Sequence, residues 1–205
     1  MDSVFDPSSQ HGDVDAKIVA SLERLGQAFR VLLRERAREH NLSPIGAQFL
    51  VYLLHHDVEL RRVGQLAREF DITPATVSDA VDSLEAKGLV ERQRWPEDRR
   101  VITLRLSPQG ELLAAGLSSW ADTVKEHLEL YSPEEKEVVM RFLMRLIGSL
   151  QRTGIVTVAR MCVTCRFFRR DVHPGADQPH HCGLLDVPLG ATDLRIDCPE
   201  HEPAV

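Results

Sequence analysis

Cysteine is scarce in this chain, and its distribution is uneven. Only four cysteines occur among the 205 residues, and all of them lie within the last 44. Clustered thiols that include a Cys-x-x-Cys pair, in a chain without a secretory signal, favour a metal site over structural disulfides. The cysteines therefore distinguish the C-terminal part of the chain from the rest.

Long apolar runs are also missing. The longest uncharged apolar-rich run, residues 43–54, has 12 residues, whereas a membrane-spanning helix needs about 20. The opening segment, MDSVFDPSSQHGDVD, is acidic and polar and resembles neither a signal peptide nor a transit peptide. We expect a cytoplasmic protein that does not associate with membranes.

Motifs of catalysis are absent from the sequence as well. It has no Ser/His/Asp triad spacing, no glycine-rich phosphate loop and no paired-acid motif, so we expect a protein that is not an enzyme.

Positive charge is in the minority, with 25 Lys and Arg against 31 Asp and Glu and a net charge of −6. Residues 86–105 are the exception, with six basic and three acidic residues, and such a stretch can attract phosphates locally.

Apolar periodicity predicts several helices after a non-periodic segment, residues 1–14, that we expect to be disordered. Helical spacing covers residues 15–40, and a second helix begins at Ser43-Pro44, an N-cap followed by proline. Two shorter helices follow, over residues 63–70 and about 74–87. The latter two are joined by a tight turn and form a helix-turn-helix.

The period then changes from helical to alternating. Residues 89–94 and 101–106 read as two strands around a polar, proline-bearing loop, which predicts a β-hairpin, or wing, directly after the helix-turn-helix. Ser-Pro signals then begin two further helices, each with one apolar stripe, over residues 107–131 and 132–150.

With these motifs in this order, residues 15–150 resemble a winged helix-turn-helix transcriptional regulator of the MarR family. The residues that carry the resemblance are LSPIGAQFLVYLL at 42–54, VGQLAREFDITPATVSDAVDSLEAKGLVERQRWPEDRRVITLRLSPQG at 63–110, and the two helices that follow. The Asp98-Arg99-Arg100 triplet matches the D-x-R signature of the wing. The resemblance implies a mainly α fold with a small β-wing, in which a winged helix-turn-helix core at about 43–106 lies within a domain spanning 15–153.

The resemblance also implies a symmetric homodimer built from the terminal helices. The apolar stripes of helices 15–40, 107–131 and 132–150 exceed what a small winged core can cover, which favours the same conclusion; the alternative is one monomeric bundle. Members of the family often bind small phenolic compounds, but nothing in this sequence identifies an effector.

Double-stranded DNA is the expected partner. The start of the 74–87 helix is slender and polar, so it can enter a major groove. The candidate contact residues there are Thr73, Ala75, Thr76 and Ser78. The alternative is that Thr73 only caps the helix.

Because the 74–87 helix has no Arg or Lys before Lys87, much of the affinity must come from the wing. Its candidate residues are Arg94, Arg99 and Arg100, which surround the proline-bearing tip and suit a minor groove. The resemblance implies that Asp98 orients one of these arginines by a bidentate pair. The alternative is a solvated hairpin with ordinary surface charge.

Residues 154–205 lie outside the resemblance and are predicted to form a Cys/His-rich extension. They are too few and too rich in proline and glycine for a robust core, so the segment is either disordered or stapled by a metal. The Cys162-x-x-Cys165 turn presents two thiolates to one ion, and Cys198-x-x-His201 repeats that spacing.

The identity of the metal stays open at this point. A zinc ion would take Cys162, Cys165 and Cys198, together with Cys182 or His201. An iron–sulfur cluster would take the four cysteines alone, whose C-x2-C-x16-C-x15-C spacing loosely resembles that of high-potential iron–sulfur proteins. Reduced thiols in a floppy tail are the third possibility.

Together these observations predict a homodimeric DNA-binding transcriptional regulator, with repression favoured, and a small metal-stapled C-terminal module. That module either senses redox or metal status or is purely structural. The alternatives are a winged-helix adaptor for protein contacts with a structural metal site, and a metalloenzyme or electron carrier.

Overall fold

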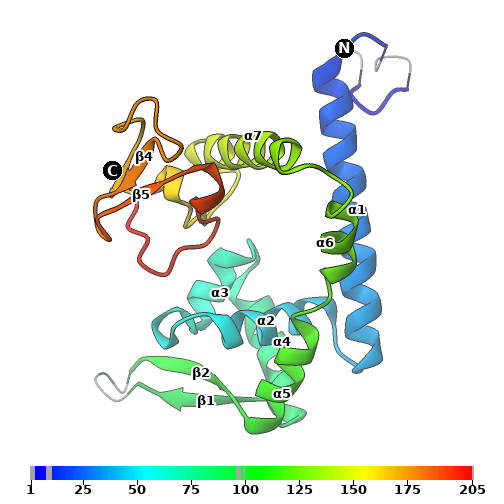
Figure 1. The fold of residues 1–205 in the computed structure, drawn as a ribbon. Helices are drawn as coiled ribbons and strands as arrows, with labels where there is room; N and C mark the ends of the chain where they lie inside the picture. The colour runs from blue at the N-terminus through cyan, green and yellow to red at the C-terminus, as the bar shows by residue number, and fades with distance from the viewer. Residues whose placement is uncertain (1–2, 8–10, 96–97, 99, 205) are drawn as a thin grey trace. The chain divides into compact units, whose positions relative to one another are not determined.

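A computed structural model describes residues 3–7, 11–95, 98 and 100–204 (Figure 1). The chain divides into two compact units, one made of Met1–Leu54, Ala80–Glu91 and Leu106–Lys125 and the other of His55–Asp79, Arg92–Arg105 and Glu126–Val205. The α-helices are α1 (Val14–Glu39), α2 (Pro44–His55), α3 (Val63–Glu69), α4 (Pro74–Ala86), α5 (Pro108–Leu117), α6 (Asp122–Leu128) and α7 (Pro133–Arg152). The strands are β1 (Val90–Arg94), β2 (Ile102–Leu106), β3 (Phe168–Arg169), β4 (His180–Cys182) and β5 (Val187–Leu189).

The first unit has a core of side chains from α2, the second half of α4 and α5. The buried residues include Phe49, Leu50, Leu53, Val81, Leu84, Ala114 and Leu117. Ser107 fixes the entry into α5, because its Oγ donates to the carbonyl of Gly88 at 2.6 Å and accepts from the N–H of Gly110 at 3.0 Å. Gly110 in turn packs so closely that a Cβ there would lie 2.0 Å from the carbonyl oxygen of Leu89.

The predicted helix-turn-helix is confirmed. Leu66 and Ala67 of α3 and Val77 of α4 are buried, and the turn between the helices passes through Asp71 in the left-handed region, at φ 51°. Gly88 follows α4 with φ +68°, the left-handed conformation that favours glycine at the C′ position of a helix.

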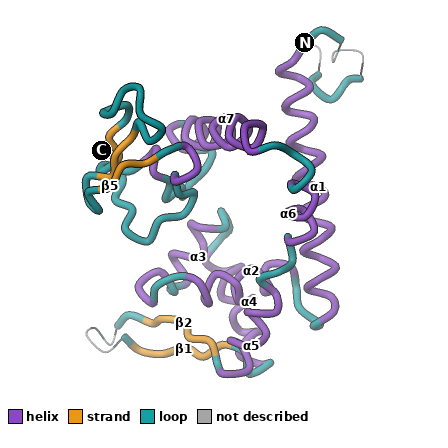
Figure 2. Tube along the Cα trace, viewed as in Figure 1, coloured by secondary structure: helices purple, strands orange, loops and turns teal. Residues whose placement is uncertain are grey.

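The predicted wing is confirmed as a two-stranded sheet of β1 and β2 (Figure 2). The N–H of Leu104 in β2 donates to the carbonyl of Arg61 at 2.7 Å, so the segment before α3 lies along the outer edge of the hairpin. Trp95 closes the strands near the tip, where its N–H donates to the carbonyl of Val101 at 2.8 Å. The hairpin is thereby tied to the start of α3.

The long helix expected over residues 107–131 was wrong, because α5 ends at Leu117 and α6 begins at Asp122. Two serine hydroxyls compete with the helical backbone at the break: Ser118 Oγ donates to the carbonyl of Ala114 and Ser119 Oγ to that of Gly116. The backbone N–H of Trp120 then reaches back only three residues, to the carbonyl of Leu117. Apolar spacing alone does not reveal this competition.

The C-terminal extension is folded over its described residues. β3, β4 and β5 form an antiparallel sheet in that order, and Figure 1 shows β4 and β5 beside α7. Met144 of α7 and Ala159 and Met161 of the extension are buried together. The extension therefore packs on α7, the last helix of the MarR-like region. A capping box formed by Ser132 and Glu135 begins this helix.

Among the described residues, no helix combines the length and apolarity that crossing a membrane requires.

Candidate functional site

The first turn of α4 presents small polar side chains to solvent. Thr73 caps the helix, since its Oγ1 accepts from the N–H of Thr76 at 3.1 Å and lies 2.9 Å from the Thr76 hydroxyl. Thr73, Ala75 and Thr76 are exposed and Ser78 is half-buried. Capping occupies one lone pair of the Thr73 hydroxyl, so the capping role and a further contact are compatible.

The structure describes two of the three arginines predicted to contact DNA from the wing. Arg94 and Arg100 are exposed, and the carboxylate of Asp98 accepts from the backbone N–H of Arg100 at 3.0 Å. Arg99 lies outside the described residues, and the bidentate pair between Asp98 and one of the wing arginines stays a prediction. Asp98 acts here on the backbone of the tip.

One residue that contacts the wing, Arg62, was missed by the sequence reasoning. The guanidinium carbon of Arg62 lies 5.7 Å from the ring centroid of Trp95, a cation–π contact between the N-cap of α3 and the base of the tip. No short motif marks this pair, because the contact depends on the pairing of the 61–62 segment with β2.

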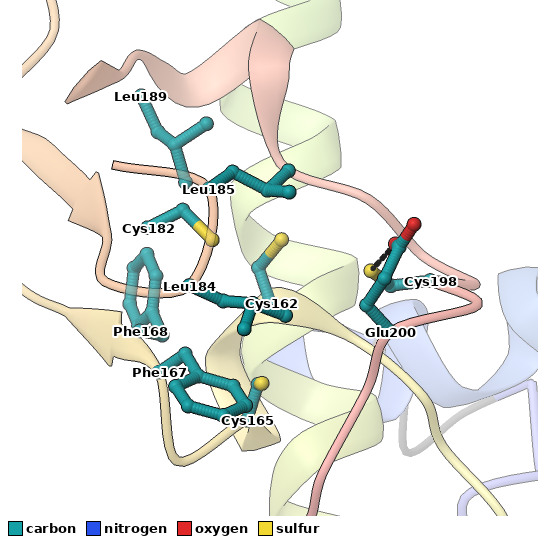
Figure 3. A pocket seen from close by; sticks show the side chains of 10 residues that line it. All are labelled: Cys162, Cys165, Phe167, Phe168, Cys182, Leu184, Leu185, Leu189, Cys198 and Glu200. Carbon is teal, nitrogen blue, oxygen red and sulfur yellow. Dashed lines mark hydrogen bonds between the residues drawn. The ribbon is translucent and has the colours of Figure 1, made fainter. Parts of the chain in front are cut away.

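All four cysteines line one cavity, although they come from separate segments (Figure 3). Cys162 and Cys165 belong to η2 (Cys162–Thr164) and its C-cap, Cys182 to β4, and Cys198 to the loop near the C-terminus. The cavity is small, with a volume of about 30 Å³, and it is partly open to solvent. Its other lining residues are Phe167, Phe168, Leu184, Leu185, Leu189 and Glu200. All four thiols are free.

Arg195 and Glu200 supply the polar contacts of the cavity. Cys162 Sγ accepts from the backbone N–H of Arg195 at 3.2 Å, and Cys198 Sγ lies 3.7 Å from Arg195 Nη1. The Cys198 thiol donates to Glu200 Oε2 at 3.3 Å. Burial raises the pKa of the Cys162 and Cys198 thiols, because it disfavours the charged thiolate.

The other predicted ligand, His201, does not line the cavity. Its Nε2 lies 3.0 Å from the hydroxyl of Thr164. Within the described part of the chain, no three His, Cys, Asp or Glu side chains are arranged to hold a single metal ion. Zinc and an iron–sulfur cluster therefore both stay predictions.

Comparisons with known proteins agree with this geometry over the first two-thirds of the chain. Residues 40–101 match the sequence model of the MarR family. The HTH-type transcriptional repressor YetL of Bacillus subtilis is 28% identical over 150 residues, which are 69% of this chain and 90% of that protein. The chain is a MarR-family helix-turn-helix transcriptional regulator. The prediction that it is not an enzyme is confirmed by this membership.

Solved structures show the same fold. The transcriptional regulator PA3341 superimposes with a TM-score of 0.59 at 26% identity, over 66% of this chain and 98% of that one. The S. aureus MepR–DNA complex superimposes with a TM-score of 0.57 at 22% identity, over 64% of this chain and 97% of MepR. Part of this MarR-family chain has no counterpart in these three proteins.

A polar cluster joins the extension of this MarR-family protein to its helix-turn-helix. Arg160 Nη1 donates to Glu69 Oε2 at 2.8 Å, and Arg160 Nε donates to Asp197 Oδ1 at 2.6 Å. His56 Nε2 lies 2.7 Å from Asp197 Oδ2, and Thr157 Oγ1 donates to Asp71 at 3.3 Å. We call Arg160, Glu69, Asp197 and His56 the Arg160 cluster.

The charges in the Arg160 cluster stabilise one another. Burial opposes the charged form of Asp197, but hydrogen bonds from Arg160 and His56 outweigh that effect and lower its pKa. Likewise, the hydrogen bonds to Asp197 and Glu69 raise the pKa of Arg160 despite its burial. The sequence reasoning missed this cluster, whose members are far apart in the chain.

Proposed function

We propose that this protein acts in the cytoplasm as a homodimeric repressor that reads double-stranded DNA with the start of α4 and the arginines of the wing. The observation that carries the proposal is the slender, exposed first turn of α4 beside a wing with exposed Arg94 and Arg100, in a MarR-family fold. Small side chains admit a helix to the major groove, and arginines suit the narrow minor groove. The MepR–DNA complex is a protein of the same fold on DNA.

Dimerisation is supported by exposed apolar side chains on the helices outside the winged core. On α1 these are Val14, Val19, Leu25 and Phe29, and in the 128–142 region they are Leu128, Leu130, Tyr131, Val138, Val139 and Phe142. Apolar faces of this extent on terminal helices indicate a protein interface. A second copy of this chain is the natural occupant, because reading two DNA half-sites requires a two-fold dimer.

Regulation by the C-terminal extension is the second part of the proposal. Asp197 precedes Cys198 in the chain, and the N–H of Cys198 donates to the carbonyl of Arg160 at 2.9 Å. Two hydrogen bonds therefore connect Cys198 to Glu69 at the end of α3: one from Cys198 to the backbone of Arg160, and one from the side chain of Arg160 to Glu69. A metal bound by this module can shift DNA affinity only by as much as its own binding affinity differs between the DNA-binding state of the protein and the other state.

The test measures binding to DNA from upstream of the protein's own coding region and to unrelated DNA of equal length, over a series of salt concentrations. We expect tighter binding to the upstream DNA and an affinity that falls linearly with salt on a log–log plot. Sedimentation at the same protein concentrations should give a dimer. A protein that binds neither DNA at low salt would be an adaptor instead.

A further inference from the structure

We propose that the cavity lined by Cys162, Cys165, Cys182 and Cys198 holds an iron–sulfur cluster, with all four cysteines as its ligands. The inference deepens the sensing half of the proposed function, because it names the cofactor of the module. It does not depend on DNA binding, and its test measures the cofactor alone.

A single metal ion does not fit the arrangement of the sulfurs. Zinc binds thiolates at about 2.3 Å in a tetrahedron, so its ligands must converge on one point. The described residues contain no three His, Cys, Asp or Glu side chains so placed. Instead the four thiols surround a cavity, and Figure 3 shows them reaching it from different elements. Thiols that line one cavity without being placed around a single point suit a polynuclear core, in which each thiolate binds its own iron.

The walls of the cavity are those of a site for a large, soft cofactor. Five of its lining side chains are aromatic or aliphatic: Phe167, Phe168, Leu184, Leu185 and Leu189. An apolar shell limits the access of water and sets the potential of a cluster. The β3–β4 hairpin holds this shell in register, with Phe168 paired to Cys182 and the N–H of Gly183 donating to the carbonyl of Phe167 at 2.9 Å.

Arg195 provides hydrogen-bond donors beside the sulfurs, and its guanidinium, which also pairs with Glu200 at 3.1 Å, places positive charge there. A cluster with four thiolate ligands is an anion, and burying an anion is costly unless it is paired and hydrogen-bonded. The backbone N–H of Arg195 already donates to Cys162 Sγ, and its guanidinium lies beside Cys198 Sγ. Hydrogen bonds to ligand sulfurs are a recognised means of tuning clusters.

Assembly requires no oxidant or reductant if iron is supplied in both oxidation states. Each thiol loses its proton as its sulfur bonds to iron, and Glu200 accepts the hydrogen bond of the Cys198 thiol where that proton leaves. Equal amounts of ferrous and ferric iron, with one sulfide per iron, balance a cubane core with four thiolates at an overall charge of minus two. No net electron transfer occurs in this step.

The experiment is purification of the full chain without oxygen, followed by iron, acid-labile sulfide and zinc analysis and visible absorbance. A parallel sample is made metal-free and then reconstituted with ferrous iron, ferric iron and sulfide. We expect iron and sulfide in equal amounts, at least two of each per chain, with the visible absorbance of a cluster. One zinc per chain without sulfide, or no sulfide in either sample, would overturn the proposal.

Two variants separate the cluster from the zinc site that uses a histidine. Cys182→Ser removes a ligand that a cluster needs, whereas His201→Ala removes only the alternative ligand of zinc. We expect cluster content to fall at least several-fold in Cys182→Ser and to stay at the wild-type level in His201→Ala. The reverse pattern contradicts the proposal. The cofactor content of the wild-type chain decides the matter even if Cys182→Ser does not fold.

Discussion

The guanidinium of Arg160 donates to the carboxylate of Glu69 across 2.8 Å, although 91 residues separate them in the chain. Both side chains are largely shielded from water, with 14% and 21% of their surface exposed. This pair anchors the C-terminal extension to the last turn of α3. It therefore links a segment that the relatives do not share to the part of the fold that they do.

The first prediction concerns the stability that this pair contributes. Arg160→Met should lower the free energy of unfolding by about 1.5–3 kcal/mol, the range for hydrogen bonds to charged groups, because it leaves Glu69 without that partner. Arg141→Met is the matched control, since its i,i+4 pair with Glu137 is exposed and should contribute at most about 0.5 kcal/mol. Urea unfolding of both variants measures the difference. Equal losses of unfolding free energy in the two variants would show that the Arg160–Glu69 pair stabilises the protein no more than an exposed surface pair does.

The second prediction concerns two glycines of one helix. Gly110→Ala should be strongly destabilising, because the new Cβ would lie 2.0 Å from the carbonyl oxygen of Leu89 and the backbone would have to move. Gly116→Ala, in the same helix α5, meets no atom within 4 Å and should leave stability unchanged or raise it by up to about 1 kcal/mol. Thermal unfolding compares them, and a Gly110→Ala melting temperature equal to that of Gly116→Ala would contradict the close approach.

Local signals made most of the winged helix-turn-helix predictable. Thr73 and Gly88 mark the ends of α4 because capping and left-handed geometry each favour particular residues. The break between α5 and α6 at Ser118 was not predictable from apolar spacing, because it depends on which backbone carbonyls accept hydrogen bonds from the hydroxyls of Ser118 and Ser119. Met144 was also missed as a core residue: α7 carries a second apolar face, and only the fold of the extension shows what covers it.

The candidate site was predictable in its residue types and not in its arrangement. The Cys-x-x-Cys spacing predicts a metal site, which stays a prediction, and the structure brings all four cysteines to one cavity. That His201 lies outside this cavity depends on the path of the chain after Cys165, which no local pattern determines. The Arg160 cluster depends on the same path.

The third prediction concerns the wing. Arg94→Ala and Arg100→Ala should weaken binding to all DNA sequences to a similar extent, and each lost phosphate contact should lower the salt slope by about 0.9. Arg24→Ala removes one positive charge from an exposed position of α1 and serves as the control. Fluorescence anisotropy at several salt concentrations gives the slopes. If the double wing variant keeps the wild-type slope, the wing does not contact phosphates.

The fourth prediction concerns the dimer. Phe142→Glu replaces an aromatic residue on α7 that is 42% exposed in the single chain. We expect the dimer dissociation constant to rise at least about tenfold, because burying such a side chain contributes about 1.5–3 kcal/mol. Thr192→Glu introduces the same charge at an exposed position of η3 (Ala191–Asp193) and should leave the dimer unchanged. Sedimentation velocity over a concentration series measures both, and a Phe142→Glu protein that stays dimeric would place the interface elsewhere.

The last prediction concerns communication between the cysteines and the helix-turn-helix. In the wild type, loading the module with its cofactor should change the affinity for upstream DNA, within the roughly 5–150-fold range of allosteric coupling. Arg160→Met should bring this ratio close to one while the cofactor content stays at the wild-type level, because the substitution removes the side chain that joins Asp197 to Glu69. Arg141→Met should keep the wild-type ratio. Anisotropy titrations of the loaded and cofactor-free forms of all three proteins provide the comparison. A wild type whose affinity ignores the cofactor would make the module a structural staple, and a full response in Arg160→Met would show that the signal takes another route.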